Sequence, residues 1–171
     1  YVSIVLAAAL WFWVQDAPPG VASAAVVPKR AGWASGLGLV ARNPQTWLAF
    51  IMHTGLIGSY LTFSGLWAVP YLTDGLGLSR SEATLHVTVM ILGLAFGAPV
   101  VGTLSDRMGL RRPLLRGASL LFLLCWVPLV LGWKLPLALS YVVYALIGLG
   151  MGSVVLCWAL AKEVNPPELS G

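Results

Sequence analysis

Long apolar stretches with very few charges alternate with short polar segments along this chain. Four of these stretches lie near residues 47–71, 83–104, 113–133 and 135–161, and only the third contains a charged residue, Arg116. A helix needs about 20 apolar residues to cross the hydrocarbon core of a bilayer. Backbone amides in lipid must be satisfied within the segment, which favours helices. The pattern therefore predicts four full transmembrane helices.

Residues 1–14 form a further apolar run that is too short to cross a bilayer. We interpret this run as a truncated transmembrane helix and expect the sequence to be a fragment. Residues 15–46 are rich in proline and glycine at their start, which is typical of a linker. Within them, Trp33, Leu37 and Val40 fall on one helical face. That spacing fits a short helix on the membrane surface, with an irregular loop as the alternative.

Basic residues divide unequally between the two sets of loops that join the spans. One set holds eight of them, namely Lys29, Arg30, Arg42, Arg107, Arg111, Arg112, Arg116 and Lys162. The other set holds only Arg80 and Lys134. The positive-inside rule places the richer set in the cytoplasm. The linker is then cytoplasmic, and the first full span runs from the inside to the outside.

The composition agrees with a membrane protein and excludes several other classes. Hydrophobic residues make up 58% of the 171 residues and charged residues only 9%, whereas a soluble domain has about 25% charged residues. The net charge of +4 does not indicate a nucleic-acid partner, because the basic residues flank apolar runs. Cys125 and Cys157 lie inside apolar runs and predict no disulfide framework. Neither a metal nor another cofactor is expected.

The tightest of the predicted cytoplasmic loops carries the most informative motif. Gly109 suits a residue with positive φ in a short reversal, and Pro113 suits the first turn of the next helix. Asp106 lies at the membrane boundary, where it could bond Arg107, Arg111 or the N-terminus of a neighbouring helix. Such a contact would act as a latch between the inner ends of helices. The alternative is a basic turn with an incidental acid.

The residues of this loop resemble the signature loop of the major facilitator superfamily. The matching positions are Gly102, Leu104, Ser105, Asp106, Arg107, Gly109, Arg111 and Arg112. The end of the chain, from Ala161 to Gly171, looks like the family segment after the tenth helix. Two positions depart from the family pattern: Leu110 replaces a basic residue, and Ser170 replaces an arginine that is frequent in sugar carriers.

This resemblance implies an all-α integral membrane fold, a partial major-facilitator-type bundle with four full helices and one truncated helix. Residues 1–14 would be the end of helix six, residues 15–46 the linker between halves, and residues 47–171 part of the C-terminal half. The implied function is secondary active transport of a small solute by alternating access. The implied partners are a small-molecule substrate, membrane lipid, the missing half of the transporter and a coupling ion, either proton or sodium. The expected location is a bacterial inner membrane.

Polar side chains form a stripe along the first full span. His53, Tyr60, Ser64, Trp67 and Tyr71 are spaced so that, at about 100° per residue, they share an arc of roughly 60°. The fourth span has a similar stripe that includes Tyr141 and Tyr144. Polar groups facing acyl chains are costly, and the resemblance places both helices along a central cavity. The candidate cavity residues are His53, Tyr60, Ser64, Trp67, Tyr141 and Tyr144. The alternative for Trp67, Tyr71 and Tyr141 is an aromatic belt at the membrane interface.

Two pairs of glycines predict close contacts between helices. Gly93 and Gly97 form one G-x-x-x-G pattern, and Gly148 and Gly152 form another. His53 is a candidate for proton coupling or a hydrogen-bonded structural residue. No acid lies inside the full spans, so the main coupling carboxylate is expected in the missing half.

Two other functions compete with transport. One is a receptor or scaffold that uses the same fold without transporting, because fold alone does not determine function. The other is an integral-membrane enzyme that modifies a lipid. Such an enzyme needs a cluster of acids, histidines or metal ligands, and these spans contain only two isolated histidines. The sequence therefore favours a transporter over an enzyme.

Overall fold

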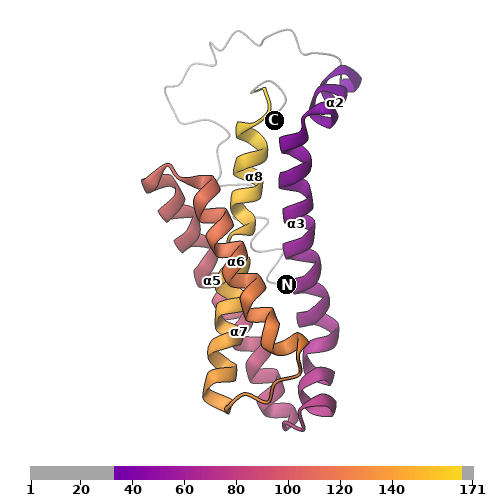
Figure 1. The fold of residues 1–171 in the computed structure, drawn as a ribbon, viewed down its shortest axis with the longest axis vertical. Helices are drawn as coiled ribbons and strands as arrows, with labels where there is room; N and C mark the ends of the chain where they lie inside the picture. The colour runs from indigo at the N-terminus through magenta and orange to yellow at the C-terminus, as the bar shows by residue number, and fades with distance from the viewer. Residues whose placement is uncertain (1–32, 167–171) are drawn as a thin grey trace, which may run out of the picture. The chain divides into compact units, whose positions relative to one another are not determined.

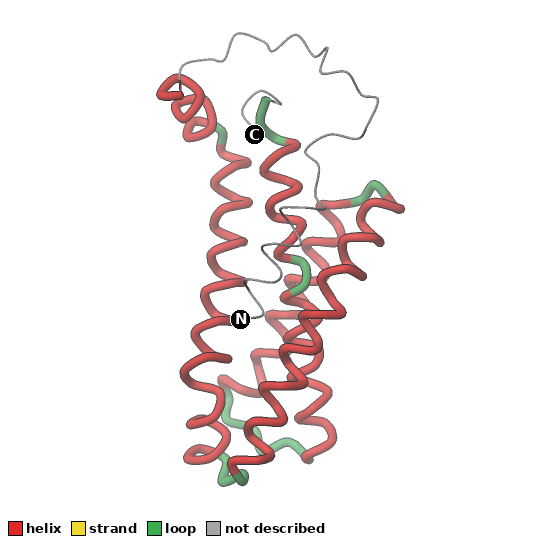
Figure 2. Tube along the Cα trace, turned by 180° about the vertical axis from the view of Figure 1, so that it is seen from behind, coloured by secondary structure: helices red, strands yellow, loops and turns green. Residues whose placement is uncertain are grey.

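The computed structural model describes residues 33–166, and the predicted truncated helix at residues 1–14 lies outside this range, as does most of the linker. Every regular element in the described part is helical, as Figures 1 and 2 show. In chain order the elements are α2 (Trp33–Arg42), α3 (Pro44–Thr62), η1 (Phe63–Trp67), α4 (Ala68–Pro70), η2 (Tyr71–Gly75), α5 (Arg80–Met108), α6 (Arg111–Val130), α7 (Leu137–Met151) and α8 (Val154–Glu163). The expected all-α fold class is confirmed, and so is a short helix at Trp33–Arg42.

Within residues 33–166, three helices are long and apolar enough to cross a membrane. They are Arg80–Met108, Arg111–Val130 and Leu137–Glu163, the last of which combines α7 and α8. The predicted span 83–104 lies inside the first of them, and the predicted span 135–161 starts two residues before the last, at Leu135. The third predicted span extends beyond α6, because the helix ends at Val130.

The first predicted span, 47–71, has a different construction. It lies in a helical path that starts with α3 and passes through η1, α4 and η2, both η segments being π-helical. Asn43 caps the start of α3 by accepting a hydrogen bond from the Gln45 backbone N–H. Pro70 lacks an N–H, so it cannot bond the carbonyl one turn before it. The two π segments lie on either side of this interruption. This path is not among the three regular helices that could span a membrane.

Local sequence explains the ends of α5 and α6. Ser79 and Glu82 form a reciprocal capping box at the start of α5. Gly109 caps the end of the helix in the left-handed conformation, with φ of 63°. The positive φ expected for Gly109 is therefore confirmed. Pro113 lies in the first turn of α6, as expected. The tight reversal between Met108 and Arg111 brings the last turn of α5 next to the first turn of α6.

Helices α5 and α7 form the most extensive helix pair among the described residues. Gly93 and Gly97 of α5 lie against Gly148 of α7 and against Gly152, which directly follows α7. A Cβ atom added to Gly97 would lie 2.7 Å from the Leu149 carbonyl oxygen, and one added to Gly148 would overlap the Met90 carbonyl oxygen. The backbones therefore approach so closely that only glycine fits.

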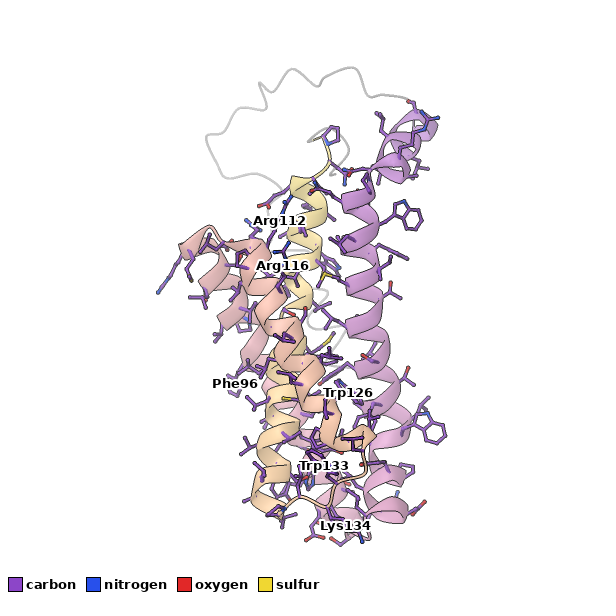
Figure 3. The ribbon with its side chains drawn as sticks, viewed as in Figure 1. Phe96, Arg112, Arg116, Trp126, Trp133 and Lys134 are labelled. Carbon is purple, nitrogen blue, oxygen red and sulfur yellow. The ribbon has the colours of Figure 1, made fainter. Side chains whose placement is uncertain are left out.

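Large apolar side chains cover much of the outer surface of the described helices. Figure 3 shows Phe96 pointing away from α5, and its side chain is 68% exposed. On α6, Leu120, Leu123 and Leu124 are exposed in the same way. Such a surface is unfavourable in water and favourable in lipid. Figure 3 also shows Arg112 at one end of the bundle and Lys134 at the other, and we call these the Arg111 end and the Lys134 end.

Candidate functional site

One arginine joins three helices at the Arg111 end. The Arg111 Nε lies 2.6 Å from the Glu163 Oε1, at the last residue of α8. The Arg111 Nη2 lies 3.3 Å from the Asp106 Oδ1, near the end of α5. Arg111 itself is the first residue of α6. Of the partners considered for Asp106, Arg111 is the one that forms an ion pair with it in the structure. Arg111 also pairs with Glu163, a carboxylate that was not connected with Arg111 from the sequence. The ends of α5, α6 and α8 are therefore held by one guanidinium group.

The other residues of the loop have different surroundings. Arg112 Nη2 donates a hydrogen bond of 2.7 Å to the Gln45 Oε1 of α3. Arg107 is exposed. A Cβ atom added to Gly102 would meet no other atom within 4 Å among the described residues. No other helix approaches Gly102 closely among the described residues, in contrast with Gly97.

Polar contacts also join α3 to α8 at the Arg111 end. Asn43 Nδ2 donates to the Val164 carbonyl oxygen at 2.6 Å, and Asn165 Nδ2 donates to Thr46 Oγ1 at 2.8 Å. These three polar side chains were not identified from the sequence, because Asn165 is 119 positions from Thr46. The only local signal was the Asn43–Pro44 helix start.

His53 lies on the same α3–α8 face. Its Nδ1 accepts a hydrogen bond of 3.1 Å from the Trp158 Nε1. Both side chains line a shallow groove of about 210 Å³ between α3 and α8, together with Phe50 and Thr46. Trp158 is 64% exposed, so within the described part of the chain the groove is open where Trp158 lines it. This groove presents an imidazole, an indole and a phenyl ring in one place.

The remaining members of the first polar stripe do not share one environment. Tyr60 is buried, and its hydroxyl donates to the Met90 carbonyl oxygen of α5 at 3.3 Å. Tyr71 donates to the Leu129 carbonyl oxygen of α6 at 2.8 Å. Ser64 is half-buried, whereas Trp67 is 61% exposed. The stripe assumed 100° per residue throughout, and the π-helical segment that begins at Phe63 breaks that periodicity.

A buried aromatic cluster lies toward the Lys134 end, between α5 and α7. His86 is fully buried, and its ring stacks on Tyr141 with centroids 4.0 Å apart. The ring of Tyr144 meets His86 edge-on at 5.0 Å. The His86 Nδ1 lies 2.7 Å from the Glu82 carbonyl oxygen and the Nε2 lies 2.9 Å from Ser140 Oγ. A carbonyl only accepts, so Nδ1 carries a proton, and in the neutral tautomer Nε2 accepts from the serine hydroxyl.

The sequence placed Tyr141 and Tyr144 in the second stripe but did not connect them with His86. Both tyrosines contact this histidine within the bundle. The Tyr144 hydroxyl is buried and has no hydrogen-bond partner among the described residues. No cluster of three or more His, Cys, Asp or Glu side chains suited to a metal ion occurs in the described range.

Two buried tyrosines provide a matched stability test. Tyr60→Phe removes the hydrogen bond to the Met90 carbonyl and should lower the free energy of unfolding by about 1 kcal/mol. Tyr144→Phe removes a hydroxyl with no partner in the described structure, so it should leave stability unchanged or raise it. Thermal unfolding of both variants in the same detergent measures the difference. Equal losses in the two variants would contradict the assignment.

Comparison with known proteins supplies the family. The sequence profile of the Major Facilitator Superfamily matches residues 1–171. The chain belongs to the major facilitator superfamily. No curated protein and no solved structure matches the chain. The match confirms the family that the loop around Asp106 resembled.

Membership in the major facilitator superfamily identifies a multi-pass integral membrane protein of a transporter family whose substrates are small molecules. Proteins of this superfamily are transporters and not enzymes. Arg111 and Asp106 belong to the loop that resembles the signature loop of this family. The groove beside His53 lies between α3 and α8. These two features are the candidate gate and the candidate solute-facing surface.

Proposed function

We propose that this major facilitator chain contributes to secondary transport by alternating access, with Arg111 as the centre of an inner gate. The observation that carries the proposal is the pair of contacts from Arg111 to Asp106 and Glu163. These contacts join residues at the ends of three helices. When they are broken, the helix ends are free to separate and admit water and solute from the cytoplasm.

The strength of this gate suits a repeated switch. The side chains of Arg111, Asp106 and Glu163 are 31%, 70% and 50% exposed, so water and salt screen both ion pairs. Exposed pairs of this kind contribute about 0–1 kcal/mol each. Two such pairs bias the closed state without making it irreversible. A transporter needs this balance, because it must leave each state in every cycle.

The α3–α8 face is the proposed solute-facing surface. His53 and Trp158 line the open groove there, and aromatic and imidazole groups suit a small solute with both apolar and polar parts. Tyr60, Tyr141 and Tyr144 contact neighbouring helices and are proposed to position this surface. Ser64 and Trp67 stay candidates for contact with the solute or with the other half of the transporter.

The coupling ion is proposed to bind mainly outside this chain. The described spans hold no Asp or Glu at their centres, since Glu82 and Asp106 lie near the two ends of α5. A proton or sodium ion that drives transport needs a carboxylate in most sites of this kind. We therefore propose that the main coupling carboxylate lies in the other half of the transporter. The proposed location of the whole transporter is a bacterial inner membrane.

Uptake measurements test the proposal. In vesicles that contain the complete transporter, Asp106→Asn should slow the uptake of labelled solutes while leaving the amount of protein in the membrane unchanged. Asp74→Asn is the matched control, because Asp74 is an exposed acid remote from the Arg111 contacts, and its carboxylate accepts a hydrogen bond from Thr73 and from no other side chain in the described range. The control should transport at the wild-type rate. Wild-type uptake by Asp106→Asn would contradict the gate, and no uptake of any solute by the wild type would favour a receptor or scaffold.

A further inference from the structure

A second groove opens at the Arg111 end between α3, α6 and α8, with a volume of about 190 Å³. Arg112 and Arg116 of α6 line it and, being four residues apart, lie on the same helix face. Gln45 of α3 lies across the groove and accepts the hydrogen bond from Arg112. Figure 3 shows both arginines near this end of α6, beside α8. The groove therefore has two guanidinium groups along one wall.

The rest of the groove is apolar. Leu48 and Met52 line it from α3, and Leu160 lines it from α8. Leu48 is 56% exposed, whereas Leu160 is buried. An apolar floor of this kind suits a hydrocarbon chain and does not suit a small hydrated ion.

The charge of the groove is uncompensated within the described residues. No Asp or Glu is among its lining side chains. The two acids at this end, Asp106 and Glu163, are both engaged by Arg111. An anion that enters the groove would therefore meet two cations without displacing an existing carboxylate.

The position of Arg112 and Arg116 along the membrane normal also favours an anion as their binding partner. Helix α6 is a candidate span that begins at Arg111, so Arg112 and Arg116 lie in its first two turns. This is the depth at which a spanning helix passes the lipid headgroups. A guanidinium group is costly toward the hydrocarbon unless an anion pairs with it. Phosphate is such an anion, and the planar guanidinium matches it with two parallel hydrogen bonds.

We propose that this groove binds an anionic phospholipid of the cytoplasmic leaflet. The phosphate of the headgroup pairs with Arg112 and Arg116, and one acyl chain lies along Leu48, Met52 and Leu160. The combination of two cations and an apolar floor is what selects a lipid over free phosphate. The bound lipid fills a groove between three helices beside the Arg111 contacts, and this role is separate from binding of the transported solute.

Native mass spectrometry of the purified protein in detergent tests the proposal. Dioleoylphosphatidylglycerol should bind, and dioleoylphosphatidylcholine, which has no net charge, should bind more weakly. The double variant R112Q/R116Q should bind phosphatidylglycerol about twenty-five-fold more weakly, because each cation contributes about a factor of five. The matched control R42Q/K162Q removes two exposed cations that do not line the groove. It should change the affinity by less than about threefold.

Two further variants separate loss of binding from loss of folding and identify the source of the phosphate. R112K/R116K keeps both charges and should retain most of the binding. Leu48→Trp keeps both arginines but fills the apolar floor, so it should weaken lipid binding and leave the thermal unfolding temperature near the wild-type value. The proposal is overturned if R112Q/R116Q binds phosphatidylglycerol as the wild type does, or if both lipids bind equally. It is also overturned if millimolar inorganic phosphate displaces the lipid, since the groove would then be a site for free phosphate.

Discussion

Gly148→Ala should largely prevent the protein from folding, although it adds only one methyl group. That methyl carbon would overlap the Met90 carbonyl oxygen and would lie 2.8 Å from the Leu94 backbone nitrogen. Backbone atoms on both sides of the contact cannot rotate away as side chains do, so α5 and α7 must separate. Overpacking usually costs 1–3 kcal/mol, and a clash with backbone belongs at about 3 kcal/mol or above. The yield of monodisperse protein in detergent and its thermal unfolding temperature measure the loss.

The same substitution elsewhere provides the control. Gly58 lies inside α3, and a Cβ atom there would meet nothing within 4 Å among the described residues. Gly58→Ala should therefore stabilise the helix by about 0.5–1 kcal/mol, because alanine loses less backbone freedom than glycine. Opposite signs for the two changes are the expected result. A Gly148→Ala protein as stable as the wild type would show that α5 and α7 do not pack through these glycines.

This contact divides the described helices into a rigid part and a part that can move. Glycine packing and the hydrogen bond between Ser140 Oγ and His86 Nε2 hold α5 to α7 along much of their length. At the Arg111 end, exposed polar contacts hold α5, α6 and α8 together instead. Buried backbone contacts change little during a conformational cycle, whereas exposed ion pairs exchange readily with water. The proposed gate therefore lies where the described helices are held by the more easily broken contacts.

Much of this arrangement could be predicted from the sequence because it depends on local chemistry. The positive φ of Gly109 follows from a short reversal between two apolar runs, and the spans follow from their length. The pairing of Arg111 with Glu163 could not be derived, because the two residues are 52 positions apart (163 − 111) and only the packing of α6 and α8 brings them together. The π-helical segments Phe63–Trp67 and Tyr71–Gly75 were not predicted from the sequence. The periodicity that grouped His53 with Trp67 failed because the first of these segments departs from 100° per residue.

Arg111→Gln should have the largest effect on the conformational equilibrium among changes in the signature loop. It removes both ion pairs, whereas Asp106→Asn keeps the shorter contact of 2.6 Å to Glu163. Glu163→Gln keeps the longer contact to Asp106. The expected order of effect is therefore Arg111→Gln first, then Glu163→Gln, then Asp106→Asn. Because all three side chains are partly exposed, losing both pairs should lower the free energy that favours the closed state by at most about 2 kcal/mol. A loss of about 2 kcal/mol multiplies the open-to-closed ratio by about 30.

A distance measurement detects this opening without knowledge of the solute. Spin labels at the exposed positions Met108 and Lys162 report the separation of the ends of α5 and α8. Arg111→Gln should shift the distance distribution toward longer values, and high salt should shift the wild type in the same direction because it screens the pairs. Arg107→Gln removes an exposed cation from the same loop and should leave the distribution unchanged. Exchanging the charges in R111E/E163R restores one ion pair, so it should return part of the closed population. If Arg111→Gln and the wild type gave the same distances at low salt, the Arg111 contacts would be structural and the gate would lie elsewhere.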